Sequence, residues 1–249
     1  MPFTLSHTAF SLLFFFFLRA KKLSATGLIL GCMAPDFEYF LRMKMYGSWG
    51  HEWWGMLFLD VPIALLIAVL FHQYIRDALI RHAPHALKLR FSVYYQLDWG
   101  LYLKQHFSRV VFSILLGIFS HVLWDAFTHQ NGFFVENIAV LQHAIQVSNL
   151  NIPVYKIAQH MSSLLGLILM MMYVCSLPKS KPLVQLTSSH WYYWLGVVLC
   201  FSVFFTLWSC AHPELILKIG HVVVASIACL FWSVLLLSIG DARVKQSMS

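Results

Sequence analysis

Long apolar runs separated by short polar segments recur along the whole chain. Five of them reach the roughly 20 residues that an α-helix needs to cross the hydrocarbon core of a bilayer. These five runs are approximately Trp54–Gln73, Phe107–Phe127, Ile157–Leu177, Trp191–Ala211 and Ile216–Ile239. Two shorter runs come first, Leu5–Leu18 and Leu23–Met33, and they are interpreted either as two short spans or as one re-entrant hairpin. The pattern predicts an all-α polytopic integral membrane helix bundle, with five full spans and two short N-terminal helices.

The composition agrees with a membrane location and excludes a soluble globular domain. Hydrophobic residues make up 59% of the chain and charged residues only 11%, whereas soluble domains carry about 25% charged residues. Such a chain would leave a large apolar surface that only lipid tolerates. Because neither repeats nor a flexible linker interrupts the runs, we expect residues 1–249 to form a single membrane domain.

The basic residues divide the connections between the runs into two sides. One side holds 13 of the 17 Lys and Arg residues, and the positive-inside rule places that side in the cytoplasm. The prediction is a multi-pass protein of the inner (plasma) membrane, with its N-terminus outside and its C-terminus in the cytoplasm. The net charge of +7 then reflects topology and contact with the lipid bilayer. A nucleic-acid partner is not expected, because no basic cluster is interleaved with aromatics on a polar background.

Three polar residues recur at intervals of four near the end of one predicted span. His121, Asp125 and His129 therefore lie on one helix face, each one turn from the next. Imidazole together with carboxylate is a ligand set that suits Zn²⁺, Mn²⁺ or Fe²⁺. A hydrogen-bond network between helices uses the same residue types, so the spacing alone leaves both interpretations open.

Four more groups of metal-ligand type fall at the same end of their helices. They are His7, Asp36, His51 and His160, and the topology places all of them at the outer level that also holds His129. The topology follows from apolar runs and basic loops, so this convergence is independent of the histidine positions. The predicted metal ligands are therefore His7, Asp36, His51, His121, Asp125, His129 and His160.

Two further residues are predicted to support the ligands. Asp60 lies inside the run Trp54–Gln73, where a carboxylate needs a partner or a proton. It is interpreted either as the acceptor for a histidine N–H group or as a polar contact between helices near Pro62. Thr128, which directly precedes His129, is assigned to the same supporting shell.

The sequence also resembles a known family in four places. The opening MPFTLSH, the step APD that ends at Asp36, the block SHVLWDAFTH from Ser120 to His129 and the tract QHMSSLLG from Gln159 resemble domain-of-unknown-function 4184, an uncharacterised bacterial membrane family. The resemblance covers residues 1–177, which form a family-like core. Residues 178–249 add two less distinctive C-terminal spans.

That family is distantly similar to predicted membrane-bound metal-dependent hydrolases. These share an early Ser/Gly-His, a Pro-Asp step and a Ser-His-x3-Asp helix, and the likeness extends to helical zinc phospholipases of the C type. The resemblance implies that His7, Asp36, His51, His121 and Asp125 occupy ligand positions. One departure is that His51 lies in Gly-His-Glu, where relatives carry a Thr-His-Ser-type element.

Three classes of function are compatible with these residues. The preferred one is a metal-dependent hydrolase at the outer membrane face, acting on a phosphoester or on an amphiphilic, lipid-linked substrate. It would use a divalent metal, zinc first and manganese or iron otherwise, with Asp125 and Asp36 as catalytic carboxylates that bridge ions or act as base. The alternatives are a non-catalytic scaffold with a His/Asp hydrogen-bond network and a transporter. A transporter relay should spread its ionisable groups through the bilayer depth, whereas here they gather at one end.

Overall fold

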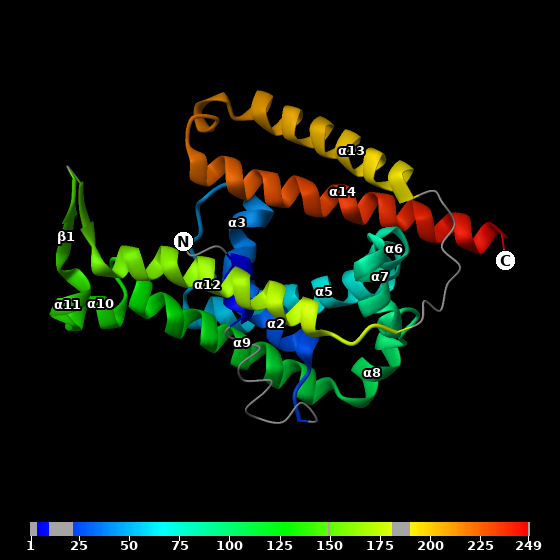
Figure 1. The fold of residues 1–249 in the computed structure, drawn as a ribbon, viewed down its shortest axis with the longest axis horizontal. Coiled ribbons are helices and arrows are strands. Elements are labelled where there is room, and N and C mark those ends of the chain that lie inside the picture. The colour runs from blue at the N-terminus through cyan, green and yellow to red at the C-terminus, as the bar shows by residue number, and fades with distance from the viewer. Residues whose placement is uncertain (1–3, 10–21, 149, 181–189, 249) are drawn as a thin grey trace. The chain divides into compact units, whose positions relative to one another are not determined.

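The computed structural model describes residues 4–9, 22–148, 150–180 and 190–248, which are almost entirely helical (Figure 1). Parts of three predictions lie outside the described residues. They are the first three residues of the opening MPFTLSH, residues 10–18 of the first short run together with the basic residues Arg19 and Lys21 that follow it, and the basic residue Lys181. The choice between two short spans and a re-entrant hairpin therefore stays a prediction.

Five helical stretches among the described residues have the length and composition of membrane spans. They are Trp53–His82, Phe107–Asn137, Val154–Ser176, Trp191–Ala211 and Ile219–Ala242. These stretches overlap the five predicted runs; the first continues nine residues beyond Gln73 and the second ten residues beyond Phe127. The all-α polytopic helix bundle is thereby confirmed, and the chain is a multi-pass membrane protein.

The first span changes helix type where it carries an acidic residue. A π-helical segment, η3 (Met56–Asp60), ends at Asp60 and is followed by Pro62, which has no N–H group to donate. The complete stretch consists of α4 (Trp53–Gly55), η3, α5 (Val61–Leu70), the π-helical η4 (Phe71–Ile75) and α6 (Arg76–His82).

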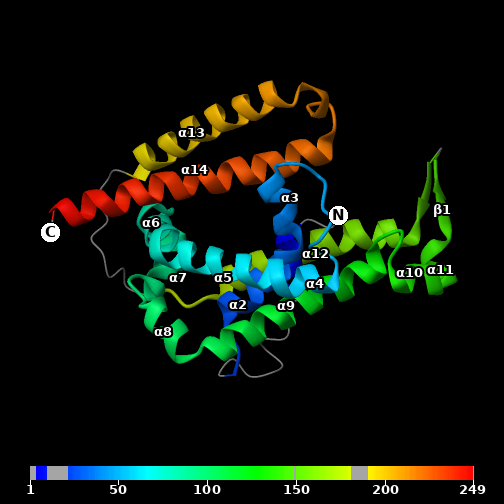
Figure 2. The same ribbon diagram turned by 180° about the vertical axis from the view of Figure 1, so that it is seen from behind.

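The chain divides into two compact units, of which the first consists of Met1–Asp36, Ser48–Leu65 and His106–Ser176. After the C-terminal end of α9, this unit continues into two short helices and an antiparallel hairpin that pairs Ala144 with Pro153 (Figures 1 and 2). Besides the helical residues 4–9, α4, η3 and the first half of α5, its elements are α2 (Ala25–Met33), the 3₁₀ turn η2 (Ala34–Asp36), α9 (Phe107–Thr128), α10 (Phe133–Asn137), α11 (Ala139–Gln142), β1 (Ala144–Val147), β2 (Leu150–Pro153) and α12 (Val154–Ser176).

Glycines bring α2 and α9 into backbone contact inside this unit. A Cβ atom at Gly31 would lie 2.2 Å from the carbonyl oxygen of Ile114, and one at Gly117 would lie 2.6 Å from the backbone nitrogen of Cys32. Small residues are common between membrane helices, where packing rather than the hydrophobic effect drives association. The close approach places the C-terminal end of α2 against the part of α9 that carries His121.

The second unit consists of Phe37–Gly47, Leu66–Gln105 and Leu177–Ser249. Its two longest helices, α13 and α14, run side by side in opposite directions (Figures 1 and 2). Asp241 of α14 accepts a hydrogen bond from Arg81 and lies 3.2 Å from Nε2 of His82, so it ties α14 to the end of α6. Besides η4 and α6, the elements are α3 (Phe37–Arg42), α7 (His85–Phe91), η5 (Ser92–Tyr94), α8 (Trp99–Gln105), α13 (His190–Ala211), η6 (Pro213–Leu215) and α14 (Ile219–Met248).

Candidate metal centre

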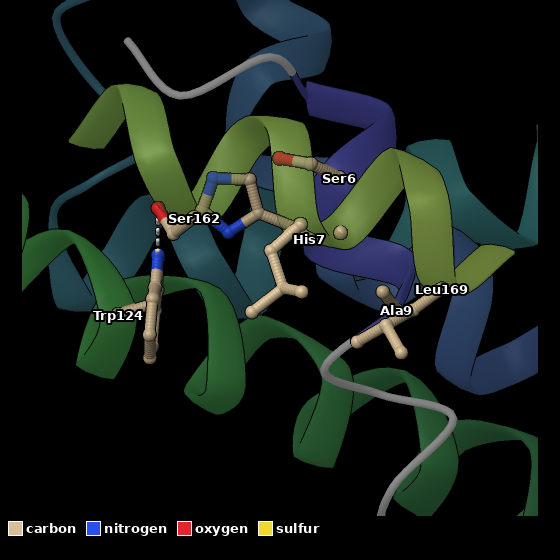
Figure 3. Close-up of a pocket in the computed structure, with 8 residues that line it drawn as sticks. Ser6, His7, Ala9, Trp124, Ser162 and Leu169 are labelled. Atoms are coloured by element: carbon tan, nitrogen blue, oxygen red, sulfur yellow. Dashed lines mark hydrogen bonds between the residues drawn. The ribbon is translucent and has the colours of Figure 1, made fainter. Parts of the chain in front are cut away.

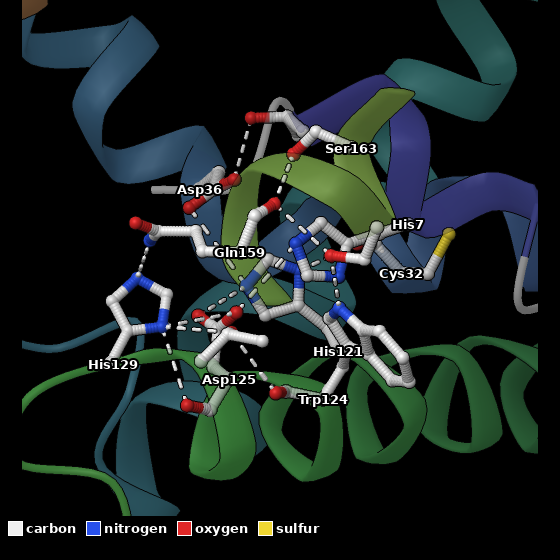
Figure 4. A network of polar contacts seen from close by, with 12 residues as sticks. His7, Cys32, Asp36, His121, Trp124, Asp125, His129, Gln159 and Ser163 are labelled. Atoms are coloured by element: carbon white, nitrogen blue, oxygen red, sulfur yellow. Dashed lines mark hydrogen bonds and ion pairs between the residues drawn. The ribbon is translucent and has the colours of Figure 1, made fainter. Parts of the chain in front are cut away.

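His121 has a defined tautomer because α2 supplies a carbonyl group beside it. Its Nδ1 lies 2.7 Å from the carbonyl oxygen of Cys32, which only accepts hydrogen bonds. Nδ1 therefore carries the proton, and Nε2 keeps the lone pair that a metal ion would use. The side chain is 1% exposed, and Nε2 lies 3.3 Å from Oδ2 of Asp125, one turn further along α9 (Figure 4).

His7 approaches the same carboxylate from the helical residues 4–9. Its ring stacks on His121 with the centroids 4.1 Å apart, and its Nε2 lies 3.6 Å from Oδ1 of Asp125. Gly166 of α12 allows this approach, since a Cβ atom there would lie 2.7 Å from the carbonyl oxygen of Ser6. Two buried imidazoles from distant parts of the sequence thus face one carboxylate.

Asp36 is held by the turn η2, where Pro35 follows the end of α2. The Thr4 hydroxyl donates a 2.6 Å hydrogen bond to its Oδ2, and its Oδ1 lies 3.9 Å from Nε2 of His121. The carboxyl group is fully buried, and this burial raises its pKa, while His121 and the Thr4 hydrogen bond act in the opposite direction. A bound cation would favour the ionised form further.

His51 is the most accessible of these groups. It lies in the segment before α4, its side chain is 40% exposed, and its Nε2 lies 3.8 Å from Oδ2 of Asp125. Its ring meets the His121 ring edge-on, with the centroids 5.8 Å apart. The cluster is therefore buried on the sides of His7, His121 and Asp36 and is open at His51.

We use the name His/Asp cluster for His7, Asp36, His51, His121 and Asp125. Two sets of three, His7 with His121 and Asp125, and Asp36 with His51 and His121, each have ligand atoms within 4.8 Å of one another. Both sets contain His121, and one imidazole nitrogen binds one ion, so we treat them as one centre.

The distances in the cluster suit coordination better than hydrogen bonding. Four buried atoms have no hydrogen-bond partner among the described residues: Nε2 of His7, Nε2 of His121, Oδ1 of Asp36 and Oδ1 of Asp125. Such atoms are rare in folded proteins because each one loses its water without compensation. Ligands at about 2.0–2.1 Å from a tetrahedral zinc ion lie roughly 3.3 Å from one another. The separations found here, 3.3–3.9 Å, are equal to or somewhat longer than that spacing.

His129 contacts the centre from outside. Its Nδ1 lies 3.4 Å from Oδ1 of Asp125, and its Nε2 lies 3.4 Å from the amide nitrogen of Gln159 on α12 (Figure 4). Thr128 donates to the carbonyl oxygen of Trp124, and its hydroxyl lies 3.4 Å from Nδ1 of His129. The two residues therefore form a chain of polar groups that leads from Asp125 to α12.

The structure does not bring His160 to this cluster. Its side chain is exposed, whereas the preceding residue, Gln159, is buried and faces His129.

Asp60 is fully buried, and its Oδ1 lies 3.6 Å from the position that a Cβ atom at Gly50 would take. Asp60 thus lies behind the segment that carries His51, and its supporting role stays a prediction.

Three contacts of the cluster were not identified from the sequence. Thr4 lies one helical turn before His7, and this spacing in an apolar run is a signal that would have identified it. Gln159 is the only amide side chain in the sequence of α12, which also makes it recognisable. The Cys32 contact uses a backbone carbonyl group, for which the sequence carries no signal.

One protein family matches the chain. It is described as Domain of unknown function (DUF4184), and the match covers residues 1–239, which extends past Leu177 and through the last predicted span. Neither the search of the curated proteins nor that of the solved structures gave a match.

Proposed function

The chain belongs to the DUF4184 family, and we propose that it is a membrane-embedded, metal-dependent hydrolase. The observation that supports this proposal is the His/Asp cluster. Four separate segments contribute five side chains of metal-ligand type, and four of their buried lone-pair atoms lack a hydrogen-bond partner among the described residues. A network that only joined helices would be expected to satisfy these atoms.

The ligand chemistry favours a divalent transition metal. Two carboxylates and neutral imidazoles would balance a charge of +2, and the mixture of nitrogen and oxygen donors suits zinc, with manganese or iron as alternatives. His7, His121, Asp36 and Asp125 would hold the ion on its buried side. When bound, such an ion polarises a phosphoryl or carbonyl oxygen and lowers the pKa of a coordinated water molecule.

Three side chains, His51, Asp125 and His129, would have separate roles in the proposed reaction. His51 is half-exposed, so water reaches the centre there, and we propose that the substrate enters on the same side. Asp125 contacts His7, His51, His121 and His129. We propose that its carboxylate orients the attacking water and accepts its proton. His129, 3.4 Å from Asp125 and linked to Gln159, would carry that proton away.

The site is proposed to face the outside of the inner (plasma) membrane. The positive-inside rule places the outer end of α9 there, with the N-terminus outside and the C-terminus in the cytoplasm. A hydrolytic centre at the end of membrane helices reaches the polar part of an amphiphilic molecule. We therefore propose a phosphoester or another lipid-linked ester as the substrate class, and Asp36 as the second carboxylate that positions it.

The test is metal-dependent hydrolysis by detergent-purified protein. The protein is stripped with a chelator, reloaded with Zn²⁺ or Mn²⁺, and assayed with bis(p-nitrophenyl) phosphate and with p-nitrophenyl esters. We expect hydrolysis only after reloading, and at least a 100-fold loss in Asp125→Asn. Because that buried variant risks misfolding, half-exposed His51→Gln is the second variant, with Asp98→Asn, directly before α8, as a control that keeps full activity. A rate that is the same with chelator, or unchanged in His51→Gln and in folded Asp125→Asn, would contradict the proposal.

A further inference from the structure

A cavity of about 220 Å³ lies beside the His/Asp cluster in the first unit (Figure 3). The helical residues 4–9, α9 and α12 enclose it. Its walls include His7 and Ala9 from the first of these, Trp124 from α9, and Leu165 and Leu169 from α12. The Trp124 indole donates a 3.3 Å hydrogen bond to the Ser162 hydroxyl, which fixes the ring against this space.

His7 belongs both to the cavity and to the cluster. The imidazole contributes to the cavity wall, while its ring stacks on His121 and its Nε2 lies 3.6 Å from Asp125. Of the five cluster residues, His7 lines the cavity, so its imidazole lies between the cavity and Asp125.

The remaining walls are mostly apolar, with the two serines Ser6 and Ser162 among them, and reach the exposed side of α12. Leu165 is 57% exposed and Leu169 is 41% exposed, although both line the cavity. In a membrane such residues contact hydrocarbon, so the cavity opens toward the bilayer. Water is a poor occupant, because a buried water molecule needs two to four polar partners.

The size of the cavity restricts what enters it. It is smaller than the roughly 300–1,000 Å³ of sites that enclose a whole small molecule. It therefore fits one flexible part of a larger ligand. A hydrocarbon chain that enters from the bilayer matches this size, the apolar walls and the open side, whereas a peptide helix is about 10 Å wide and would not fit.

We propose that this cavity holds the hydrocarbon chain of a membrane lipid and so keeps the lipid next to His7 of the His/Asp cluster. The assignment of the lipid as a substrate rests on the proposed hydrolase function. Binding of the chain rests on the apolar walls alone and needs no metal ion.

The test is lipid retention measured by native mass spectrometry in a mild detergent. The delipidated protein is incubated with phosphatidylglycerol and, separately, with glycerophosphoglycerol, the same head group without chains. Leu169→Trp and Leu165→Trp each fill the cavity from a partly exposed position that tolerates a larger side chain. Leu199→Trp on α13 is the matched control, because Leu199 is 59% exposed and lies in the other unit.

We expect one retained phosphatidylglycerol per chain in the wild type and in Leu199→Trp, and about ten-fold lower occupancy in both cavity variants. Chelator-treated protein should retain the lipid, and the chain-free head group should not bind to it. Equal occupancy in the cavity variants and the control, or no retained lipid in the wild type, would overturn the inference. Retained lipid in a protein that takes up no metal would instead contradict the hydrolase proposal and leave the cavity assignment standing.

Discussion

The contact between α2 and α9 yields a prediction that links packing to the candidate metal centre. In Gly31→Ala, the new methyl group would lie 2.2 Å from the carbonyl oxygen of Ile114, where ordinary contacts begin at 3.4 Å. The two helices must therefore separate by roughly 1 Å, because the atom in the way belongs to the backbone and has no rotamer to change. Overpacking of this kind costs about 1–3 kcal/mol.

The expected result is a lower melting temperature and weaker metal binding. For a chain of this size, 1 kcal/mol corresponds to about 2–4 °C, so the midpoint should fall by about 2–12 °C. The same separation moves the Cys32 carbonyl group away from Nδ1 of His121, now 2.7 Å distant. Loss of such an orienting contact weakens metal binding by about 10–100-fold.

The assay is thermal unfolding in detergent, followed by the loss of monodisperse protein, together with Zn²⁺ titration of the chelator-stripped protein. Gly240→Ala in α14 is the control, because a Cβ atom there meets nothing within 4 Å. Alanine is the better helix former by about 0.5–1 kcal/mol, so this control should melt at the wild-type temperature or above it. If Gly31→Ala melts with Gly240→Ala and binds zinc normally, the reasoning about this helix contact is refuted.

Three further predictions address the cluster, the second unit and the topology. Thr4→Val removes the hydrogen bond to Asp36 while keeping the side-chain shape; we expect about 10–100-fold weaker zinc binding in a titration, and unchanged affinity would contradict this support. Asp241→Asn weakens the contacts of α14 with α6. Since the groups are partly exposed, we expect the free energy of unfolding to fall by only about 1 kcal/mol in thermal unfolding. A larger fall at high salt than at low salt would be inconsistent with a screened ion pair. In intact cells, a membrane-impermeant maleimide should label Cys210, at the outer end of α13, and should reach Cys175, at the inner end of α12, only after lysis; the reverse pattern would invert the predicted orientation.

The spans were predictable because length and hydropathy encode them directly. The run Phe107–Phe127 matches α9 (Phe107–Thr128) within one residue, since lipid requires a continuous apolar stretch with satisfied backbone groups. The pairing of His121 with Asp125 was predictable for a similar reason, because residues four apart on a helix share one face. The helical period of the sequence is thus sufficient to predict that His121 and Asp125 lie together.

The rotation of each helix about its axis was not predictable from one sequence. Successive residues point about 100° apart, so the N-terminal part of α12 presents Gln159 to His129 and leaves the adjacent His160 exposed. The topology indicated which end of α12 lies near the cluster, but it did not indicate which side. The Cys32 carbonyl group was unpredictable for a different reason, since its position depends on backbone contact between helices that are distant in the sequence.

The central claim, that the His/Asp cluster binds a metal ion, is tested most directly by elemental analysis of the purified protein. Wild type is compared with His121→Ala, with His51→Ala, whose half-exposed site reduces the risk of misfolding, and with His160→Ala as the matched control. We predict roughly one transition-metal ion per chain in wild type and His160→Ala, and loss of that metal from His121→Ala and His51→Ala. A folded wild-type protein that contains no metal and takes up neither Zn²⁺ nor Mn²⁺, or full metal content in the His121 and His51 variants, would contradict the claim.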